Sequence, residues 1–313
     1  HLDMATQYQS NAEIAKALRV YLRSGPQGLD KSMRSSEKPE LLEVLDATYQ
    51  QYMKAMSING KGERGRKQGR REGLFLSHKL SNEEQSTNPK AVRQAVLSTI
   101  QALGIVDYLD LVSIHSPLTD SSRRLATYQA LLELQNEGLV RSIGVCNYGL
   151  NPLQEIAEAG MPLPVINQLE LSPFNTHSKV VEWCDTHGIA VSCAAWSRLS
   201  SADGPREQWD MLSQLAQRKG MTKAQVLVRW SLQKGYVCVP RSSSASKLER
   251  IAIAENSYGG VNRIRVEGTD VLTNEEMKFL DELDVSYKAG RLGRRDGWSD
   301  SDVSGPEWDP TEI

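Results

Sequence analysis

Short apolar runs recur along the chain, and stretches with helical spacing separate them. Short runs that are apolar throughout are typical of parallel strands buried on both faces. The pattern predicts six such strands, at residues 74–76, 109–114, 142–145, 164–166, 189–194 and 236–239. A seventh strand is expected to end near Leu2 and Asp3.

Amphipathic stretches fill the intervals between these strands, and each is followed by glycine or a turn cluster. They predict helices at residues 88–103, 125–137, 153–159, 179–186 and 223–232. Alternating strands and helices are typical of an α/β protein with a parallel sheet. Seven strands are one short of the eight in a parallel (β/α)8 TIM barrel. We therefore expect one barrel domain over residues 1–313 that lacks its first strand and helix.

Two segments do not follow this pattern. Residues 21–72 separate the first helix from the next strand by far more than a usual loop, which predicts an atypical insert. The insert contains one predicted helix at residues 40–56 and a Gly-rich basic run at residues 61–71. A nuclear signal or an anion-binding arm is one interpretation of the basic run, but such runs are more often solvated loops. Residues 288–313 lack periodicity and predict an irregular tail across the barrel mouth.

The composition limits the compartment and the partners of the chain. With 313 residues, of which 39% are hydrophobic, the chain can bury the core of one barrel. The formal net charge of -2 gives no general attraction to nucleic acid or membrane and favours a small-molecule substrate. The four cysteines form no Cys-x-x-Cys pair and no zinc spacing, so we expect a reducing, cytoplasmic compartment and no metal. No apolar run reaches the ~18 residues of a membrane span.

Polar residues follow three of the predicted strands, at the end where barrel enzymes place their catalytic groups. Asp3 and Tyr8 follow the first strand, Lys79 the second and His115 the third. Alone, each is more often a cap, a packing residue or a loop residue. In this order, however, we expect all four to face one cavity.

Such a set of side chains supports proton donation to a carbonyl oxygen. A free tyrosine has a pKa near ~10, and the adjacent Lys79 ammonium would lower the pKa of Tyr8 toward neutrality. Asp3 would hold Lys79 in place, and His115 would hydrogen-bond the oxygen as negative charge develops on it. Since no side chain supplies a hydride, the reaction needs a cofactor.

These segments resemble the catalytic segments of the aldo-keto reductases, which read D-x-A-x-x-Y, a Lys after the next strand, and I-H-x-P. Residues 138–147 and 164–170 are also similar to that family's G-x-[VI]-R-x-[IL]-G-V-S-N and N-Q-x-E segments. The similarity covers most of residues 1–20 and 74–285. It implies a barrel that reduces an aldehyde or ketone with NADPH, in which Tyr8 donates the proton.

The resemblance also implies which residues hold the nicotinamide end of the cofactor. Asn147 and Gln168 would bind the carboxamide, and Trp196 would stack on the nicotinamide ring. Ser197 and Leu199 would flank the pyrophosphate. Taken alone, these residues are more often caps or core residues, so their assignment depends on the whole pattern.

The adenosine end is implied by a later segment of the chain. Arg241 and Ser242 match the family's I-P-K-S, whose cation and hydroxyl take the adenosine 2′-phosphate, and this favours NADPH over NADH. Farther on, the family's R-x-x-E-N aligns in two registers. We prefer Lys247 for the phosphate and Asn256 for the adenine.

Two departures from the family pattern bear on activity. Cys146 stands where the family has Ser, so a weak hydrogen-bond donor replaces a good one beside the nicotinamide. The absent first strand and helix have three explanations: an incomplete gene model, which we favour, a naturally truncated relative, or replacement by residues 21–72. The alternative function is therefore a non-catalytic barrel that binds nucleotide or a protein partner. In either case we expect a monomer.

Overall fold

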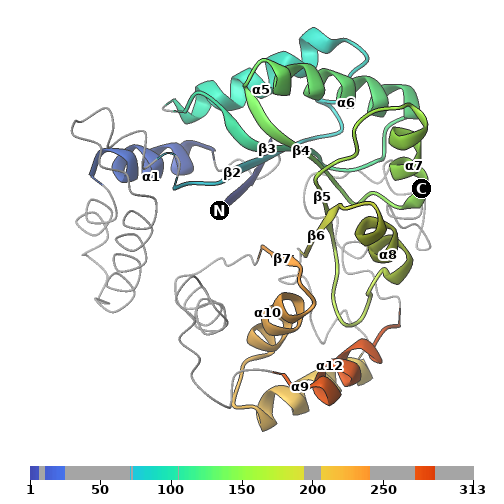
Figure 1. Cartoon of the computed structure of the whole chain (residues 1–313). Helices are drawn as coiled ribbons and strands as arrows, with labels where there is room; N and C mark the ends of the chain where they lie inside the picture. The colour runs from blue at the N-terminus through green and yellow to red at the C-terminus, as the bar shows by residue number, and fades with distance from the viewer. Residues whose placement is uncertain are drawn as a thin grey trace. The chain divides into compact units, whose positions relative to one another are not determined.

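The computed structural model describes residues 1–6, 11–24, 71, 73–104, 106–193, 206–239 and 272–285 (Figure 1). The chain divides into two compact units. Unit 1 comprises His1–Ile114 and Ser122–Ile143, and unit 2 comprises His115–Ser121 and Gly144–Ile313. The strands follow one another in sequence order from β1 to β7. The predicted single domain over the whole chain stays a prediction.

Unit 1 is built on parallel strands that are buried on both faces. It holds β1 (Leu2–Ala5), β2 (Leu76–Leu80), β3 (Leu109–Ile114) and the first residues of β4 (Val140–Cys146). Every residue of β2 and β3 is buried. The register pairs Asp3 with Ser77 and Ala5 with Lys79. Because side chains alternate along a strand, Asp3, Ser77 and Lys79 share one face of the sheet.

Helix α5 shows how the sequence fixes the helices of unit 1, which also has α1 (Asn11–Ser24) and α6 (Ser121–Asn136). α5 (Pro89–Leu103) begins after Asn88, whose side chain accepts a hydrogen bond from the Lys90 backbone N–H. Pro89 fits the first turn because the backbone N–H that it lacks would have no helical partner there. The helix ends at Gly104, whose φ of 70° is the left-handed conformation that favours glycine.

Unit 2 repeats the strand and helix alternation. It contains the end of β4, then β5 (Ile166–Leu169), β6 (Ala190–Cys193) and β7 (Val237–Cys238), which pair in parallel. Its helices are α7 (Leu150–Glu158), α8 (Ser178–Thr186), α9 (Arg206–Arg218), α10 (Lys223–Gln233) and α12 (Asn274–Asp281). α10 and α12 each begin with a capping box, formed by Thr222 with Gln225 and by Thr273 with Glu276.

The predicted elements that fall within the described residues are present, but three strand positions are wrong. β1 was expected to end near Leu2 and Asp3 and lies at Leu2–Ala5. β2 was expected at residues 74–76 and lies at Leu76–Leu80, and β5 was expected at residues 164–166 and lies at Ile166–Leu169. Both strands contain polar residues that look like loop residues in the sequence but are held by partners in the folded chain. α9 and α12 are additional helices that the apolar pattern did not single out. The predicted helix at residues 40–56 and the tail at 288–313 lie outside the described residues.

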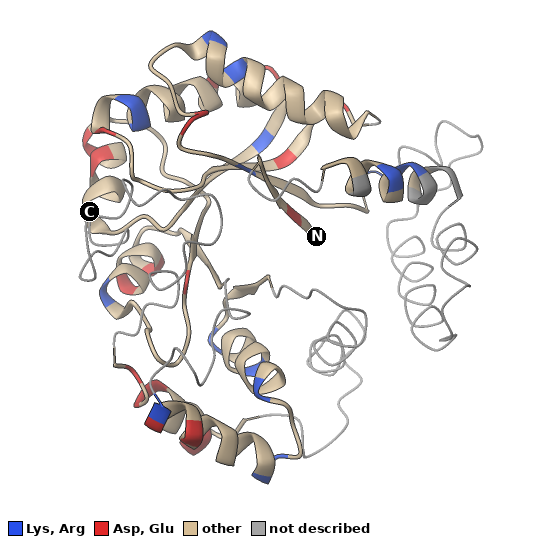
Figure 2. Ribbon diagram, turned by 180° about the vertical axis from the view of Figure 1, so that it is seen from behind, with Lys and Arg blue, Asp and Glu red and all other residues tan. Residues whose placement is uncertain are grey.

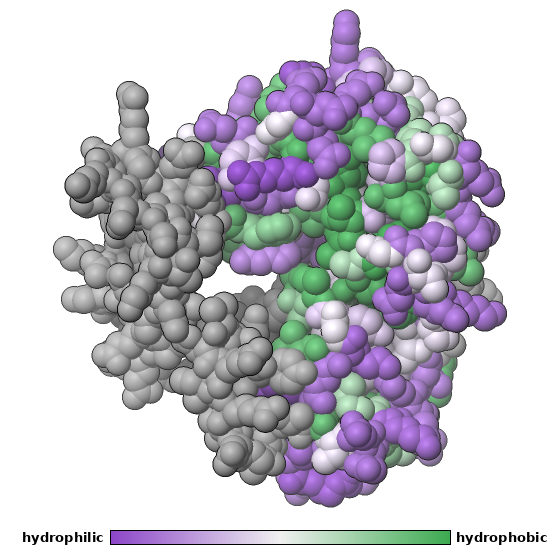
Figure 3. Space-filling view, viewed as in Figure 1, coloured by the Kyte–Doolittle hydropathy of each residue, from purple (hydrophilic) through white to green (hydrophobic). Residues whose placement is uncertain are grey.

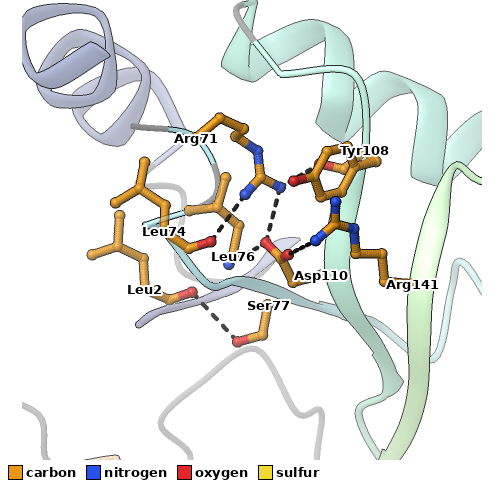
Figure 4. A network of polar contacts seen from close by, with 8 residues as sticks. All are labelled: Leu2, Arg71, Leu74, Leu76, Ser77, Tyr108, Asp110 and Arg141. Atoms are coloured by element: carbon orange, nitrogen blue, oxygen red, sulfur yellow. Dashed lines mark hydrogen bonds and ion pairs between the residues drawn. The ribbon is translucent and has the colours of Figure 1, made fainter. Parts of the chain in front are cut away.

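A buried group of charges joins the starts of β2 and β3 in unit 1 (Figure 4). Asp110 accepts hydrogen bonds from the Leu76 backbone N–H, at 2.9 Å, and from the Arg71 guanidinium, at 2.8 Å. Arg141 approaches the other carboxylate oxygen at 3.7 Å. Both guanidinium groups lie over the Tyr108 ring, at 3.9 and 4.0 Å from its centre. Arg71 is the last residue of the basic run, and here it is buried and paired with Asp110 rather than solvated.

The described surface is that of a mixed-charge protein. Lys and Arg are interspersed with Asp and Glu along the described helices (Figure 2). Hydrophilic residues gather over α9 and α12 at the bottom of the view in Figure 3. Within the described part of the chain, no helix combines the length and the apolar character needed to cross a membrane.

Candidate active site

One group of predicted site residues is an ion pair between β1 and β2 in unit 1. The Lys79 ammonium donates a hydrogen bond to Oδ2 of Asp3, and the other oxygen, Oδ1, accepts one from the Ser77 hydroxyl at 2.7 Å. The Lys79 side chain is only 2% exposed and that of Asp3 12%. A buried ammonium needs a charged partner, and Asp3 provides it. The structure thus brings together two of the four predicted catalytic residues.

Their position in the elements differs from the prediction. We expected Asp3 and Lys79 just past the ends of their strands, but Asp3 lies in β1 and Lys79 in β2. The sheet register explains this, because a Lys in mid-strand reaches a carboxylate on the same face of the neighbouring strand. Ser77 was not predicted as part of the site. It is the residue paired with Asp3, and its hydroxyl holds the carboxylate from the second side.

His78 lies on the opposite face of β2 from Lys79 and is fully buried. Its Nε2 is 3.2 Å from the Thr6 hydroxyl and 3.2 Å from the Thr99 hydroxyl. The pKa of His78 is lowered from 6.5 to about 4, chiefly by burial and also by the Lys79 charge, while the Asp3 charge partly opposes this. His78 is therefore neutral at physiological pH.

This lowered pKa predicts a pH dependence of stability. Between pH 6.5 and about 4 the unfolded chain binds a proton at His78 that the folded chain does not, so the free energy of unfolding falls as the pH falls through this window. The full shift corresponds to about 3 kcal/mol. Urea denaturation at pH 7 and pH 5 measures the effect, with His78→Gln as the matched variant. An unchanged pH dependence in His78→Gln would contradict this assignment.

A second group of predicted site residues lies in unit 2, where His115, Asn147 and Gln168 are connected. His115 directly follows β3, as predicted. The Asn147 side-chain amide donates to the His115 carbonyl at 3.1 Å, and the Asn147 backbone N–H donates to the Gln168 carbonyl at 2.8 Å. Asn147 has a φ of 59°, a left-handed conformation that asparagine tolerates better than most residues. The turn after β4 therefore joins three predicted site residues.

Asn167 holds this turn and was missed by sequence reasoning. It is fully buried, its side-chain amide donates to the Tyr148 carbonyl at 2.8 Å, and its side-chain oxygen accepts from the Tyr148 backbone N–H at 3.4 Å. Because side chains alternate along β5, Asn167 and Gln168 point to opposite faces. An Asn beside a predicted site residue in a buried strand is the signal that would have found it.

One face of unit 2 has polar groups suited to an amide or hydroxyl ligand. The register places Cys146, Gln168 and Ser192 in one row across β4, β5 and β6. The Ser192 hydroxyl is buried and has no hydrogen-bond partner among the described residues. A buried hydroxyl without a partner is costly unless a ligand group meets it. These residues could therefore hold an amide or hydroxyl group of a cofactor.

The other predicted site residues lie outside the described part of the chain. They are Tyr8, Trp196, Ser197, Leu199, Arg241, Ser242, Lys247 and Asn256. Among the described residues, no group of His, Cys, Asp or Glu is arranged to hold a metal ion.

Known proteins are similar to this chain over most of its length. The model of the aldo/keto reductase family matches residues 47–257. The methylglyoxal reductase DkgA of Escherichia coli (strain K12) is 32% identical over 249 residues, which are 79% of this chain and 78% of that protein.

Solved structures show the same fold. A Bombyx mori aldo-keto reductase in complex with NADP has a TM-score of 0.63 at 23% identity and covers 92% of this chain and 80% of its own. A mutant of Gox0644 in complex with NADPH has a TM-score of 0.58 at 28% identity and covers 70% of this chain and 73% of its own. The predicted fold class, a parallel (β/α)8 barrel, is confirmed, and seven of its strands lie in the described residues.

Proposed function

Because the chain belongs to the aldo/keto reductase family, we propose that it reduces a small aldehyde or ketone to an alcohol with NADPH. The observation that carries this proposal is the buried ion pair between Asp3 in β1 and Lys79 in β2. Asp3 precedes Tyr8 by five residues in the sequence. Buried ion pairs cost desolvation free energy, and charged groups kept buried at that cost are often functional.

Each residue of the proposed tetrad has a separate task. Tyr8 donates the proton to the substrate oxygen, and the Lys79 ammonium stabilises the tyrosinate that remains. Asp3 orients Lys79 and keeps it protonated, while Ser77 holds Asp3. His115 donates a hydrogen bond to the substrate oxygen as charge develops on it. NADPH, when bound, supplies the hydride.

The residues proposed to hold NADPH divide by the part of the cofactor they meet. Asn147 and Gln168 would bind the carboxamide, and Ser192, which is paired with Gln168 in the sheet, would offer its hydroxyl beside them. Trp196 stacks on the nicotinamide ring, with Ser197 and Leu199 at the pyrophosphate. The 2′-phosphate binds Arg241, Ser242 and Lys247, and the adenine binds Asn256. The NADP and NADPH complexes of the two solved relatives support this choice of cofactor.

We expect methylglyoxal or another small aldehyde to be reduced, since the relative DkgA is named a methylglyoxal reductase. The test is the loss of NADPH absorbance on adding methylglyoxal or a nitrobenzaldehyde, with the alcohol identified by mass spectrometry. Aldehyde-dependent NADPH oxidation supports the proposal. NADPH binding without turnover across a wide carbonyl panel would instead indicate the non-catalytic alternative, which no described feature favours.

Cofactor preference gives a sharper prediction. Arg241→Met is expected to raise the KM for NADPH about thirtyfold and to leave the KM for NADH nearly unchanged, because a charge-assisted hydrogen bond to the 2′-phosphate contributes roughly 2 kcal/mol. Initial rates with both cofactors measure this, and Arg206→Met, at the start of α9, is the control. Equal loss with NADPH and NADH would contradict the assignment. A monomeric state and a cytoplasmic location stay predictions.

A further inference from the structure

A chain of hydrogen bonds on the face of β2 opposite Lys79 has no role in the proposed reaction. It joins His78 in β2, Thr6 directly after β1, and Glu84 after β2. The Thr6 hydroxyl is 3.2 Å from Nε2 of His78 and donates to Oε2 of Glu84 at 2.7 Å. Glu84 also accepts from the Ser81 backbone N–H at 2.8 Å.

The direction of each hydrogen bond follows from the chemistry of the groups. Thr6 has one hydroxyl hydrogen, and a carboxylate oxygen only accepts, so this hydrogen goes to Glu84. The Thr6 oxygen must then accept from His78, which requires the hydrogen of the imidazole to be on Nε2. The Thr99 hydroxyl fits the same arrangement, because it donates to the Ala95 carbonyl at 3.4 Å and its oxygen shares the single Nε2 hydrogen with the Thr6 oxygen in a three-centre hydrogen bond.

We propose that His78, acting through Thr6, is a positioning residue for the segment that leads from β1 to Tyr8. Neighbouring residues of β2 hold β1 and the residue after it from opposite faces, Lys79 through Asp3 and His78 through Thr6. Tyr8 is only two residues beyond Thr6. The start of the segment is therefore fixed relative to the Lys79 ammonium, and this inference rests on the proposed role of Tyr8.

The placement of His78 argues against a purely structural role. Its imidazole is fully buried, whereas Thr6, the residue that it holds, is exposed. Replacing a buried hydrogen-bonded group and its partner by apolar groups of the same shape can be nearly neutral for stability, so stability alone does not account for a buried imidazole here. Here one of its two bonds goes to the helix α5, through Thr99, and the other to the segment before Tyr8.

Matched variants separate the two bonds. Thr6→Val removes the hydroxyl from an exposed residue of nearly the same shape, and Thr99→Val removes the other partner of His78. We expect Thr6→Val to lower kcat about tenfold with the Kd of NADPH within twofold of wild type, and Thr6→Ser to restore kcat. Thr99→Val should keep kcat within twofold. His78→Leu should lower kcat by the same factor as Thr6→Val. The double variant Thr6→Val/His78→Leu should have a kcat no lower than either single variant.

Amide hydrogen exchange of the peptide over residues 1–10, followed by mass spectrometry without cofactor, gives a readout independent of activity. Thr6→Val and His78→Leu should speed this exchange at least tenfold, and Thr99→Val should not. Wild-type exchange and wild-type kcat in Thr6→Val would overturn the proposal, as would equal losses in Thr6→Val and Thr99→Val. If wild type shows no carbonyl reduction, the proposed function fails, and the exchange rates still decide whether His78 positions the segment.

Discussion

Lys79→Met is expected to lower kcat for aldehyde reduction about a thousandfold, the middle of the range for general acid catalysis. The substitution keeps a long side chain in β2 but removes the ammonium that we propose stabilises the Tyr8 oxygen as it loses its proton. Because other residues are proposed to hold NADPH, its Kd should stay within threefold of wild type. Steady-state rates and quenching of protein fluorescence by NADPH measure the two quantities.

Two further variants test whether Lys79 and Tyr8 act as one unit. Tyr8→Phe should lower kcat by a similar factor, and the double variant should be about as slow as either single variant, since residues that act together are not additive. Lys90→Met on α5 is the control, because Lys90 is exposed. If the loss of kcat in the double variant equalled the product of the two single losses, a shared role would be contradicted. A kcat near wild type in Lys79→Met would contradict it as well.

Asp110→Ala is expected to lower the free energy of unfolding by about 3–5 kcal/mol, because it leaves a buried guanidinium without its counter-charge. The Asp110 side chain is 7% exposed and that of Arg71 10%. The substitution also removes the acceptor of the Leu76 backbone N–H, which fixes the start of β2 (Figure 4). Urea denaturation followed by circular dichroism measures the loss.

The chain offers a matched control for this ion pair on its surface. Arg93 and Glu137 also pair, but their side chains are 42% and 44% exposed. Glu137→Ala should therefore cost only about 0–1 kcal/mol, the range for solvated pairs. A loss below 1 kcal/mol for Asp110→Ala would show that the buried cluster does not hold β2 on β3.

The elements that could be predicted from sequence are those with continuous apolar patterns. β3 lies where it was expected, because its six residues are all buried and mostly apolar. β2 was placed too early because Ser77, His78 and Lys79 look polar enough for a loop. Their partners come from β1 and α5, which are distant in sequence, so no local pattern reveals that this polar stretch is buried.

The residues of the candidate site also divide into those that the sequence could predict and those that it could not. Asp3, Lys79, His115, Asn147 and Gln168 were predicted from motif order, and the structure shows contacts within each of two groups of them. Ser77, His78 and Asn167 were missed, since their roles depend on strand register and on which face each side chain takes. Tyr8, Trp196 and the residues for the adenosine end lie outside the described residues, and their roles stay predictions.

Transfer of a labelled hydride tests the central claim, that this chain is an NADPH-dependent carbonyl reductase. The full chain is mixed with methylglyoxal or a nitrobenzaldehyde and with NADPH that carries deuterium at C4, using each of the two C4 epimers. The account predicts that one epimer gives an alcohol with one deuterium on the carbon of the former carbonyl, in the same amount as the NADPH consumed. Alcohol without deuterium from either epimer, or no NADPH-dependent alcohol, would contradict it.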